Sequence, residues 1–166
     1  MDGQHYFDPH FKSDFNLFRF RDNNYICHIF AVKRQVAEQA GYFRKEFDGA
    51  QDFDFIFRCC EKAEKIVHIP KVLYHWRCHM DSTAADPESK AYAFEAGRKA
   101  VEEHYKRMGI PARVEMTERP GWYRSRLEIQ GNPLISVIIP NKDHTEDLEL
   151  CLLPWQSAPP IENYEV

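Results

Sequence analysis

The chain has 166 residues, a formal net charge of −4, 43% hydrophobic residues and 29% charged residues. This length and balance predict about one globular domain with its own core and exclude a disordered chain. A mildly acidic chain has no overall attraction to nucleic acid, so we predict no nucleic-acid partner. No apolar run approaches the roughly 20 residues of a membrane-spanning helix, and the first residues lack the basic and apolar regions of a signal peptide. The five cysteines form no C-x-x-C pair, which favours a reducing compartment over a disulfide scaffold.

The first elements in chain order are short. Residues 25–32 are rich in β-branched and aromatic side chains and predict a strand. A helix over 33–40 should follow, with Gly41 as the residue just past its end. Two further short strands are expected over 66–69 and 72–76.

Between them, the sequence predicts a second helix that opens near Gly49, with Asp52 at or beside its N-cap. Its apolar stripe, at i, i+3, i+4 and i+7, consists of Phe53, Ile56, Phe57 and Cys60. We expect Asp54 and Arg58 to take other faces of this helix, Arg58 as a structural ion-pair partner.

A longer helix is predicted to start at Asp86-Pro87-Glu88, which supplies an N-cap carboxylate and a proline in the first turn. Gly109-Ile110-Pro111 is a strong stop signal. Strand-like pieces follow over 113–117 and 122–129, around Pro120-Gly121.

The composition then changes at the breaker Gly131-Asn132-Pro133. Residues 134–139 form a continuous apolar run, as in a parallel strand that is buried on both faces. A loop, a helix over 146–153 that is broken from Leu153 onward, and the start of another strand at Tyr164 complete the chain. This order is typical of the opening of a doubly wound sheet, so we place a boundary near Asn132.

Three segments resemble family 2 glycosyltransferases. Residues 49–58 (GAQDFDFIFR) resemble the family's G-x-x-D-x-D-x-x-x-R segment, and 68–77 (HIPKVLYHWR) resemble the strand and loop that follow it. Residues 135–143 (ISVIIPNKD) are similar to the first strand of the family's nucleotide-binding half. The chain therefore looks like a seam between two tandem modules.

The resemblance implies an α/β fold: the acceptor-side half of a GT-A (Rossmann-like) domain, then a truncated β-α start of a second nucleotide-binding sheet. It divides the chain into the acceptor-side half at 1–85, a helix and β connector at 86–132, and the start of the second module at 133–166.

By the same resemblance, the chain is a fragment of an inverting glycosyltransferase of cell-surface polysaccharide synthesis. Its partners would be a nucleotide-sugar donor and a saccharide acceptor, and its cofactor Mn²⁺ or Mg²⁺ in the intact enzyme. Nucleotide-sugars imply a cytoplasmic location, with peripheral membrane association of the parent protein compatible with it. The family's D-x-D metal motif would lie upstream, so this chain alone is expected to be inactive.

The resemblance also implies roles for individual residues. Asp52 would be the catalytic base, and His75 would ligate the metal ion. The acceptor would be bound by Asp54 and Trp76, and the diphosphate by Arg77 and His79.

Simpler interpretations stay open for several of these residues. Asp52 also fits an ordinary helix cap, and His75 a hydrogen-bonded strand histidine. The aromatic side chains of residues 6–20 fit core packing as well as the stacking of sugar rings. The cysteine and histidine spacing matches no usual zinc site. A second class of function is a non-catalytic remnant that acts as a carbohydrate-contacting or interaction module.

Overall fold

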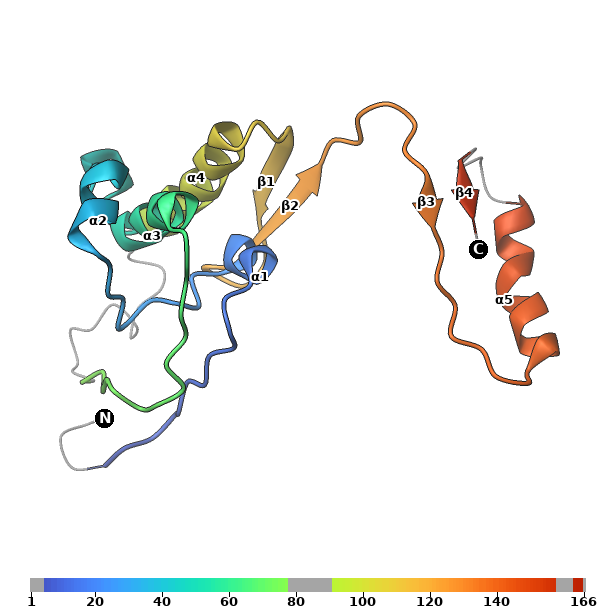
Figure 1. Cartoon of the computed structure of the whole chain (residues 1–166), viewed down its shortest axis with the longest axis horizontal. Helices are drawn as coiled ribbons and strands as arrows, with labels where there is room; N and C mark the ends of the chain where they lie inside the picture. Colours follow the sequence, from blue (N-terminus) through green and yellow to red (C-terminus); the bar gives the residue numbers. More distant parts are fainter. Residues whose placement is uncertain (1–4, 78–90, 158–162, 166) are drawn as a thin grey trace. The chain divides into compact units, whose positions relative to one another are not determined.

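The computed structural model describes residues 5–77, 91–157 and 163–165 (Figure 1). The chain divides into two units, Met1–Leu127 and Glu128–Val166. Helices and a small antiparallel sheet make the fold mixed α/β, as predicted. The assignment of the chain to two glycosyltransferase modules, with boundaries at 85 and 132, stays a prediction.

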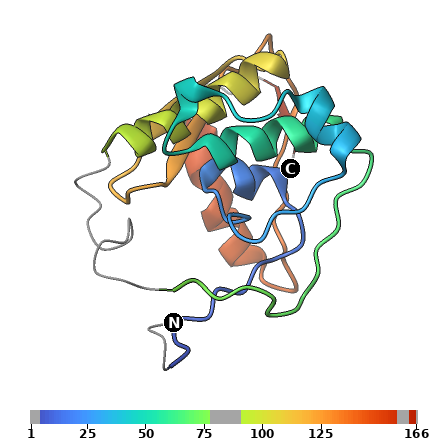
Figure 2. The ribbon, with the colours of Figure 1, turned by 90° about the vertical axis from the view of Figure 1, so that its left-hand side faces the viewer.

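The described residues of the first unit hold five helical segments and one hairpin. Its elements are α1 (Leu17–Asp22), α2 (Arg34–Ala40), the 3₁₀ turn η1 (Lys45–Phe47), α3 (Gln51–Lys62), α4 (Ala91–Arg107), β1 (Ala112–Met116) and β2 (Tyr123–Leu127). Helix α3 packs against α2 and α4, while α4 also covers β1 and α1 contacts β2 (Figures 1 and 2).

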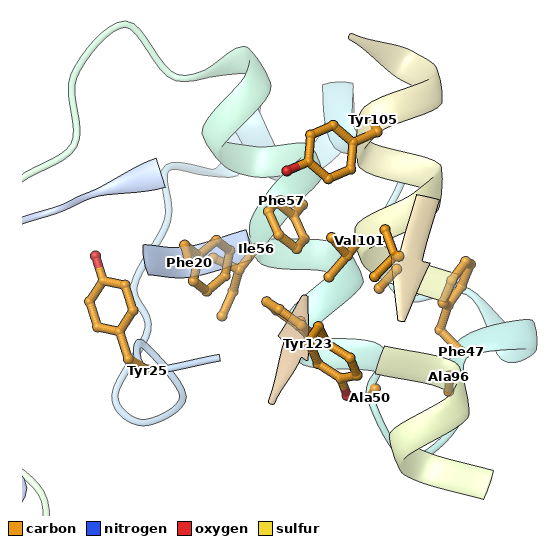
Figure 3. Packing of buried hydrophobic residues seen from close by; sticks show 13 residues of the cluster. Phe20, Tyr25, Phe47, Ala50, Ile56, Phe57, Ala96, Val101, Tyr105 and Tyr123 are labelled. Carbon is orange, nitrogen blue, oxygen red and sulfur yellow. The ribbon is translucent and has the colours of Figure 1, made fainter. Parts of the chain in front are cut away.

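Aromatic rings from α1 and α3 form the centre of the core. The ring centroids of Phe20 and Phe57 are 4.5 Å apart, and those of Phe53 and Phe57 are 4.8 Å apart. Ala100 and Val101 of α4 are fully buried against them (Figure 3). This packing confirms the inward-facing stripe of α3. Burial extends further around that helix than the stripe predicts, because its Phe55 and Cys59 pack against α2.

Glycines end two of the helices as predicted. Gly41 follows α2 with a φ of +82° and donates its N–H to the carbonyl of Ala37. Gly109 follows α4 with a φ of +66°. Both need the left-handed backbone that glycine adopts without a steric penalty. The expected start of α4 at residues 86–88 lies outside the described residues.

The three strands expected in the first half of the unit do not form. Residues 25–32 bend instead, because the side-chain oxygen of Asn24 accepts the N–H of Cys27 and Cys27 has a φ of +39°. Residues 66–69 and 72–76 run without a ladder partner among the described residues. A strand needs a neighbour for its backbone groups, which composition alone does not supply.

Two strands form where the sequence predicts strand-like pieces, and they pair with each other as a hairpin. Strands β1 and β2 pair antiparallel in the register Ala112↔Leu127 to Met116↔Tyr123. Strand β1 is as long as the predicted piece over 113–117 but begins one residue earlier, whereas β2 is shorter than the piece over 122–129. Val114 and Tyr123 point into the core.

The second unit is a strand, helix and strand. Strand β3 (Ile135–Ser136) pairs in parallel with β4 (Tyr164–Glu165), and α5 (Thr145–Ser157) lies between them in the chain. The element order matches the prediction, although β3 is shorter than 134–139. The expected break at Leu153 is wrong: α5 continues past Pro154. A proline removes one helical hydrogen bond, and here the helix continues without it. In the parts of the chain described, no helix is long and apolar enough to cross a bilayer.

Candidate functional site

Asp52 is the second residue of α3, because the N-cap is Ala50. Its carboxylate is half-buried. The amide nitrogen of the Asn24 side chain donates to Oδ2 at 3.0 Å, and the backbone N–H of Phe53 donates to Oδ1 at 2.9 Å. A carboxylate in the first turn of a helix is stabilised by the helix dipole. Asp52 thus lies inside the helix and is not its N-cap residue. Two hydrogen-bond donors hold its carboxylate in place.

Asn24 fixes this carboxylate to the loop that follows α1. Its side-chain Oδ1 accepts the N–H of Cys27 at 3.1 Å, so its Nδ2 must face Asp52. Asn24 is not among the site residues predicted from the sequence. A single asparagine in a loop carries no signal of such a role until the fold brings residues 24 and 52 together.

Next to Asn24 lies a thiol–imidazole pair. The Sγ of Cys27 is 2.8 Å from Nδ1 of His28. Burial raises the pKa of the Cys27 thiol, and the nearby charge of Asp52 raises it further. Cys27 is therefore a neutral thiol and not an activated nucleophile. The ammonium group of Lys12 donates to the carbonyls of Ile26 and His28, which fastens the N-terminal segment to this loop.

Beside this pair, five exposed rings form two groups, which together we call the aromatic platform. His28 stacks on Tyr74 with a centroid distance of 5.3 Å and meets the edge of Trp76 at 4.8 Å. Tyr6 lies 4.4 Å from His75. The platform consists of Tyr6, His28, Tyr74, His75 and Trp76. Of the residues expected in the site, His75 thus contacts a ring of the N-terminal segment, and Trp76 contacts a ring of the loop after α1.

Asp54 has a different environment, although it is only two residues from Asp52. Its side chain is fully buried, and both oxygens bind arginines. The Nε and Nη2 groups of Arg58 donate to Oδ2 at 3.0 and 2.7 Å, and Arg44 donates to both oxygens. This geometry gives Asp54 a structural role. Its expected contact with an acceptor stays a prediction that this arrangement does not support.

The two remaining residues of the expected site are those predicted to bind the diphosphate. Arg77 is exposed, and His79 lies outside the described residues. Within residues 5–77, 91–157 and 163–165, no group of three or more His, Cys, Asp or Glu side chains could hold a metal ion. The described residues thus supply no complete cation site, and metal ligation by His75 stays a prediction.

Two known proteins are similar to most of the chain. It is 43% identical over 140 residues to the uncharacterized protein y4gI of Sinorhizobium fredii, which covers 82% of the chain and 15% of that protein. It is 36% identical over 138 residues to the O-antigen biosynthesis protein RfbC of Myxococcus xanthus, which covers 83% of the chain and 11% of that protein. The chain thus spans a small part of each of these much longer relatives. No family model and no solved structure matches it.

Proposed function

We propose that this chain is part of an enzyme of polysaccharide synthesis, an inverting glycosyltransferase that moves a sugar from a nucleotide-sugar to a saccharide acceptor. Two things support the proposal: the similarity to a protein named for O-antigen biosynthesis, and the resemblance of residues 49–58 and 68–77 to family 2 glycosyltransferases. The observation in the structure that carries it is the Asp52 carboxylate, which is partly exposed and oriented by Asn24.

In this function Asp52 is the general base. It takes the proton of the acceptor hydroxyl while that oxygen forms a bond to the anomeric carbon of the donor. The bond from that carbon to the diphosphate breaks, and the nucleoside diphosphate leaves with the electron pair. Asn24 and the N–H of Phe53 hold the carboxylate while it accepts the proton. A divalent cation would neutralise the leaving diphosphate in the intact enzyme.

The test is Asp52→Asn in a polypeptide that joins this chain to the upstream D-x-D half implied by the resemblance. An amide cannot accept the proton, so the rate of sugar transfer should fall by about 10²–10⁴-fold. The affinity for the nucleotide-sugar should be unchanged. The melting temperature should fall only slightly, because Asn has nearly the same shape as Asp but can accept only one of the two hydrogen bonds from Asn24 and Phe53. Turnover and thermal unfolding are measured on the same preparation.

Asp48→Asn is the matched control, since Asp48 is exposed and four positions before Asp52. It should leave transfer unchanged. If the Asp52→Asn variant transferred sugar at the wild-type rate, Asp52 could not be the general base. The second candidate function, a carbohydrate-contacting module without catalysis, would be favoured if the joined wild-type polypeptide transferred no sugar; the exposed rings around His28 also suit that function.

A further inference from the structure

The hairpin of the first unit has two different faces. Val114 and Tyr123 point into the core, and α4 covers this side of β1. Because side chains alternate along a strand, the residues between them point away from α4. The cross-strand pairs on this outer face are Arg113–Arg126, Glu115–Arg124 and, just past the strands, Thr117–Trp122. We call these six residues, together with Arg119 of the turn, the arginine face.

Positive charge outnumbers negative charge on the arginine face. Arg113 and Arg126 lie opposite each other, with side chains 78% and 61% exposed, and both bind the carboxylate of Glu115, at 3.4 and 3.0 Å. Arg124 is exposed and has no hydrogen-bond or ion-pair partner among the described residues. With Glu118 of the turn counted as well, four arginines stand against two glutamates. Like charges opposite each other destabilise a ladder, so the face carries more arginine than its own stability requires.

The turn holds the fourth arginine and the tryptophan in fixed positions. The N–H of Trp122 donates to the carbonyl of Arg119 at 3.1 Å, and Gly121 supplies the φ of +76° that this turn needs. The hydroxyl of Thr117 accepts the N–H of Arg119 at 3.2 Å. The guanidinium of Arg119 lies over the indole of Trp122, 4.7 Å from the ring centroid. A cation and a half-exposed indole therefore stand together at one end of the arginine face.

The chemistry of this face indicates its partner. Guanidinium groups bind phosphate and carboxylate oxygens through paired hydrogen bonds. Side chains on one face of a strand recur about every 7 Å, so the arginines suit several separate anionic groups and not a single ion. Tryptophan is enriched where a membrane meets water, because its ring is amphipathic. A flat, positively charged strand face that ends in a tryptophan is complementary to a surface of anionic lipid headgroups.

A single-stranded nucleic acid is the other polyanion that arginine and tryptophan could bind. Proteins hold such strands by stacking successive bases on several aromatic rings. The arginine face offers one indole, and the guanidinium of Arg119 covers one side of it. The observations therefore favour the lipid surface.

We propose that the arginine face is a docking surface for the anionic headgroups of a membrane. The guanidinium groups bind headgroup phosphates and carboxylates, and Trp122 lies at the level of the headgroups. This proposal goes beyond the proposed function and does not rest on it, because the hairpin takes no part in the sugar-transfer step.

The experiment measures co-sedimentation of the whole 166-residue chain with lipid vesicles. Vesicles of phosphatidylcholine with about 30% phosphatidylserine should bind the chain, and pure phosphatidylcholine vesicles should not. Arg124→Gln should weaken binding about fivefold, and Arg119→Gln combined with Arg124→Gln about 25-fold. Raising the salt from about 0.05 M to about 0.5 M should also weaken binding, because salt screens exposed charges.

Arg34→Gln is the matched control, since it removes the same charge from an exposed arginine of α2. It should leave vesicle binding nearly unchanged. The substituted arginines are all exposed, so each variant should keep the melting temperature of the wild-type chain.

A second measurement reports on Trp122 itself. In a chain with Trp76→Phe and Trp155→Phe, Trp122 is the remaining tryptophan. Its fluorescence should be quenched by anionic vesicles whose lipids carry bromine. Binding without quenching would place the membrane contact elsewhere and overturn the proposal.

Four other results would also overturn it. The first is equal binding to anionic and neutral vesicles, or binding to neither. The second is an equal loss of binding in Arg34→Gln and Arg124→Gln, which would reflect net charge alone. The third is displacement from vesicles by inorganic phosphate at constant ionic strength, which would assign the face to a free phosphate ion. The fourth is tighter, arginine-dependent binding to a single-stranded oligonucleotide. None of these results depends on sugar transfer, so they leave the proposed function untouched.

Discussion

At the scale of residues, two carboxylates two positions apart on α3 have opposite surroundings. Asp52 is half-buried, with an amide and a backbone N–H as its donors. Asp54 is enclosed by the guanidinium groups of Arg44 and Arg58. Burial by itself would raise the pKa of Asp54, but the hydrogen bonds and charges of the two arginines outweigh it and hold that pKa below its ordinary value. Asp54 is therefore a charged anchor between α3 and the segment that follows α2.

Asp54→Asn should destabilise the chain strongly. The variant keeps the shape of the side chain but leaves Arg58, which is itself buried, without a counter-charge. Removing one partner of a buried ion pair typically costs about 3–5 kcal/mol. Because Arg44 is partly exposed, we expect a loss of about 3 kcal/mol in the free energy of unfolding, measured by urea titration.

Asp52→Asn, the same chemical change two residues earlier, serves as the control and should cost less than about 1 kcal/mol. Equal losses in the two variants would contradict the structural role assigned to Asp54.

At the scale of elements, α4 and β2 approach each other at a glycine. Gly97 is buried on α4, and the hydroxyl of Tyr123 on β2 donates to the carbonyl of Phe94 at 3.1 Å. A Cβ atom added at Gly97 would lie 2.0 Å from the Tyr123 oxygen. Gly97 is thus required by the close approach of the strand and not by the backbone of the helix.

Gly97→Ala should therefore destabilise the chain, although the same change in a helix interior is ordinarily worth about 1 kcal/mol of stability. Overpacking of a core typically costs about 1–3 kcal/mol, and we expect a net loss in that range by chemical denaturation. Lys99→Ala, at an exposed position of the same helix, should have little effect.

A double-mutant cycle identifies the contact. In the Tyr123→Phe background the nearest atom is gone, so Gly97→Ala should cost less there than in the wild-type chain. Equal costs in the two backgrounds would show that another neighbour is responsible.

At the scale of the whole molecule, a buried polar network ties three helices of the first unit together. His104 of α4 is almost fully buried and stacks on Phe57. Its Nε2 accepts from Arg21 of α1 at 3.1 Å, so its Nδ1 carries the hydrogen that is donated to Glu61 of α3 at 2.7 Å. Arg107 donates two further hydrogen bonds to Glu61 at 2.8 Å.

This network predicts a loss of stability in acid. Burial alone would raise the pKa of Glu61, but the hydrogen bonds from His104 and Arg107 lower it from 4.5 to about 2. Because the folded-state pKa lies below the unfolded value, the contribution of Glu61 is complete above about pH 4.5 and disappears as the pH falls toward 2. Asp54, with its lowered pKa, acts in the same direction.

The measurement is the melting temperature from pH 7 to pH 2. It should fall steeply below pH 4.5 in the wild-type chain. Glu61→Gln should lower the melting temperature at pH 7 and flatten its dependence on pH, so that the two curves converge in acid. Parallel curves for the variant and the wild-type chain would assign the acid loss to other carboxylates.

Local sequence patterns were sufficient to predict elements whose hydrogen bonds join residues that are close together in the chain. The apolar spacing of Phe53, Ile56 and Phe57 and the glycines at 41 and 109 predicted α3 and the ends of α2 and α4. The turn at Pro120-Gly121 likewise separated two strands that pair with each other. In each case the residues that contact one another are close together in the chain, so the local pattern is enough to predict the element.

Strand pairing, charge burial and ring contacts between separate elements were decided only by the tertiary structure. The segments 25–32, 66–69 and 72–76 look like strands by composition, but the described residues give them no neighbour, and they stay irregular. Asp54 looks like an exposed first-turn acid until Arg44 and Arg58 enclose it. The sequence by itself thus indicated helices α2 to α5 and the two strands of the hairpin, but it contained no signal for α1. Only the fold determined which charges are buried and which rings meet at the surface, because both depend on contacts between separate elements, as between Asp54 of α3 and Arg44 and between His28 and Tyr74.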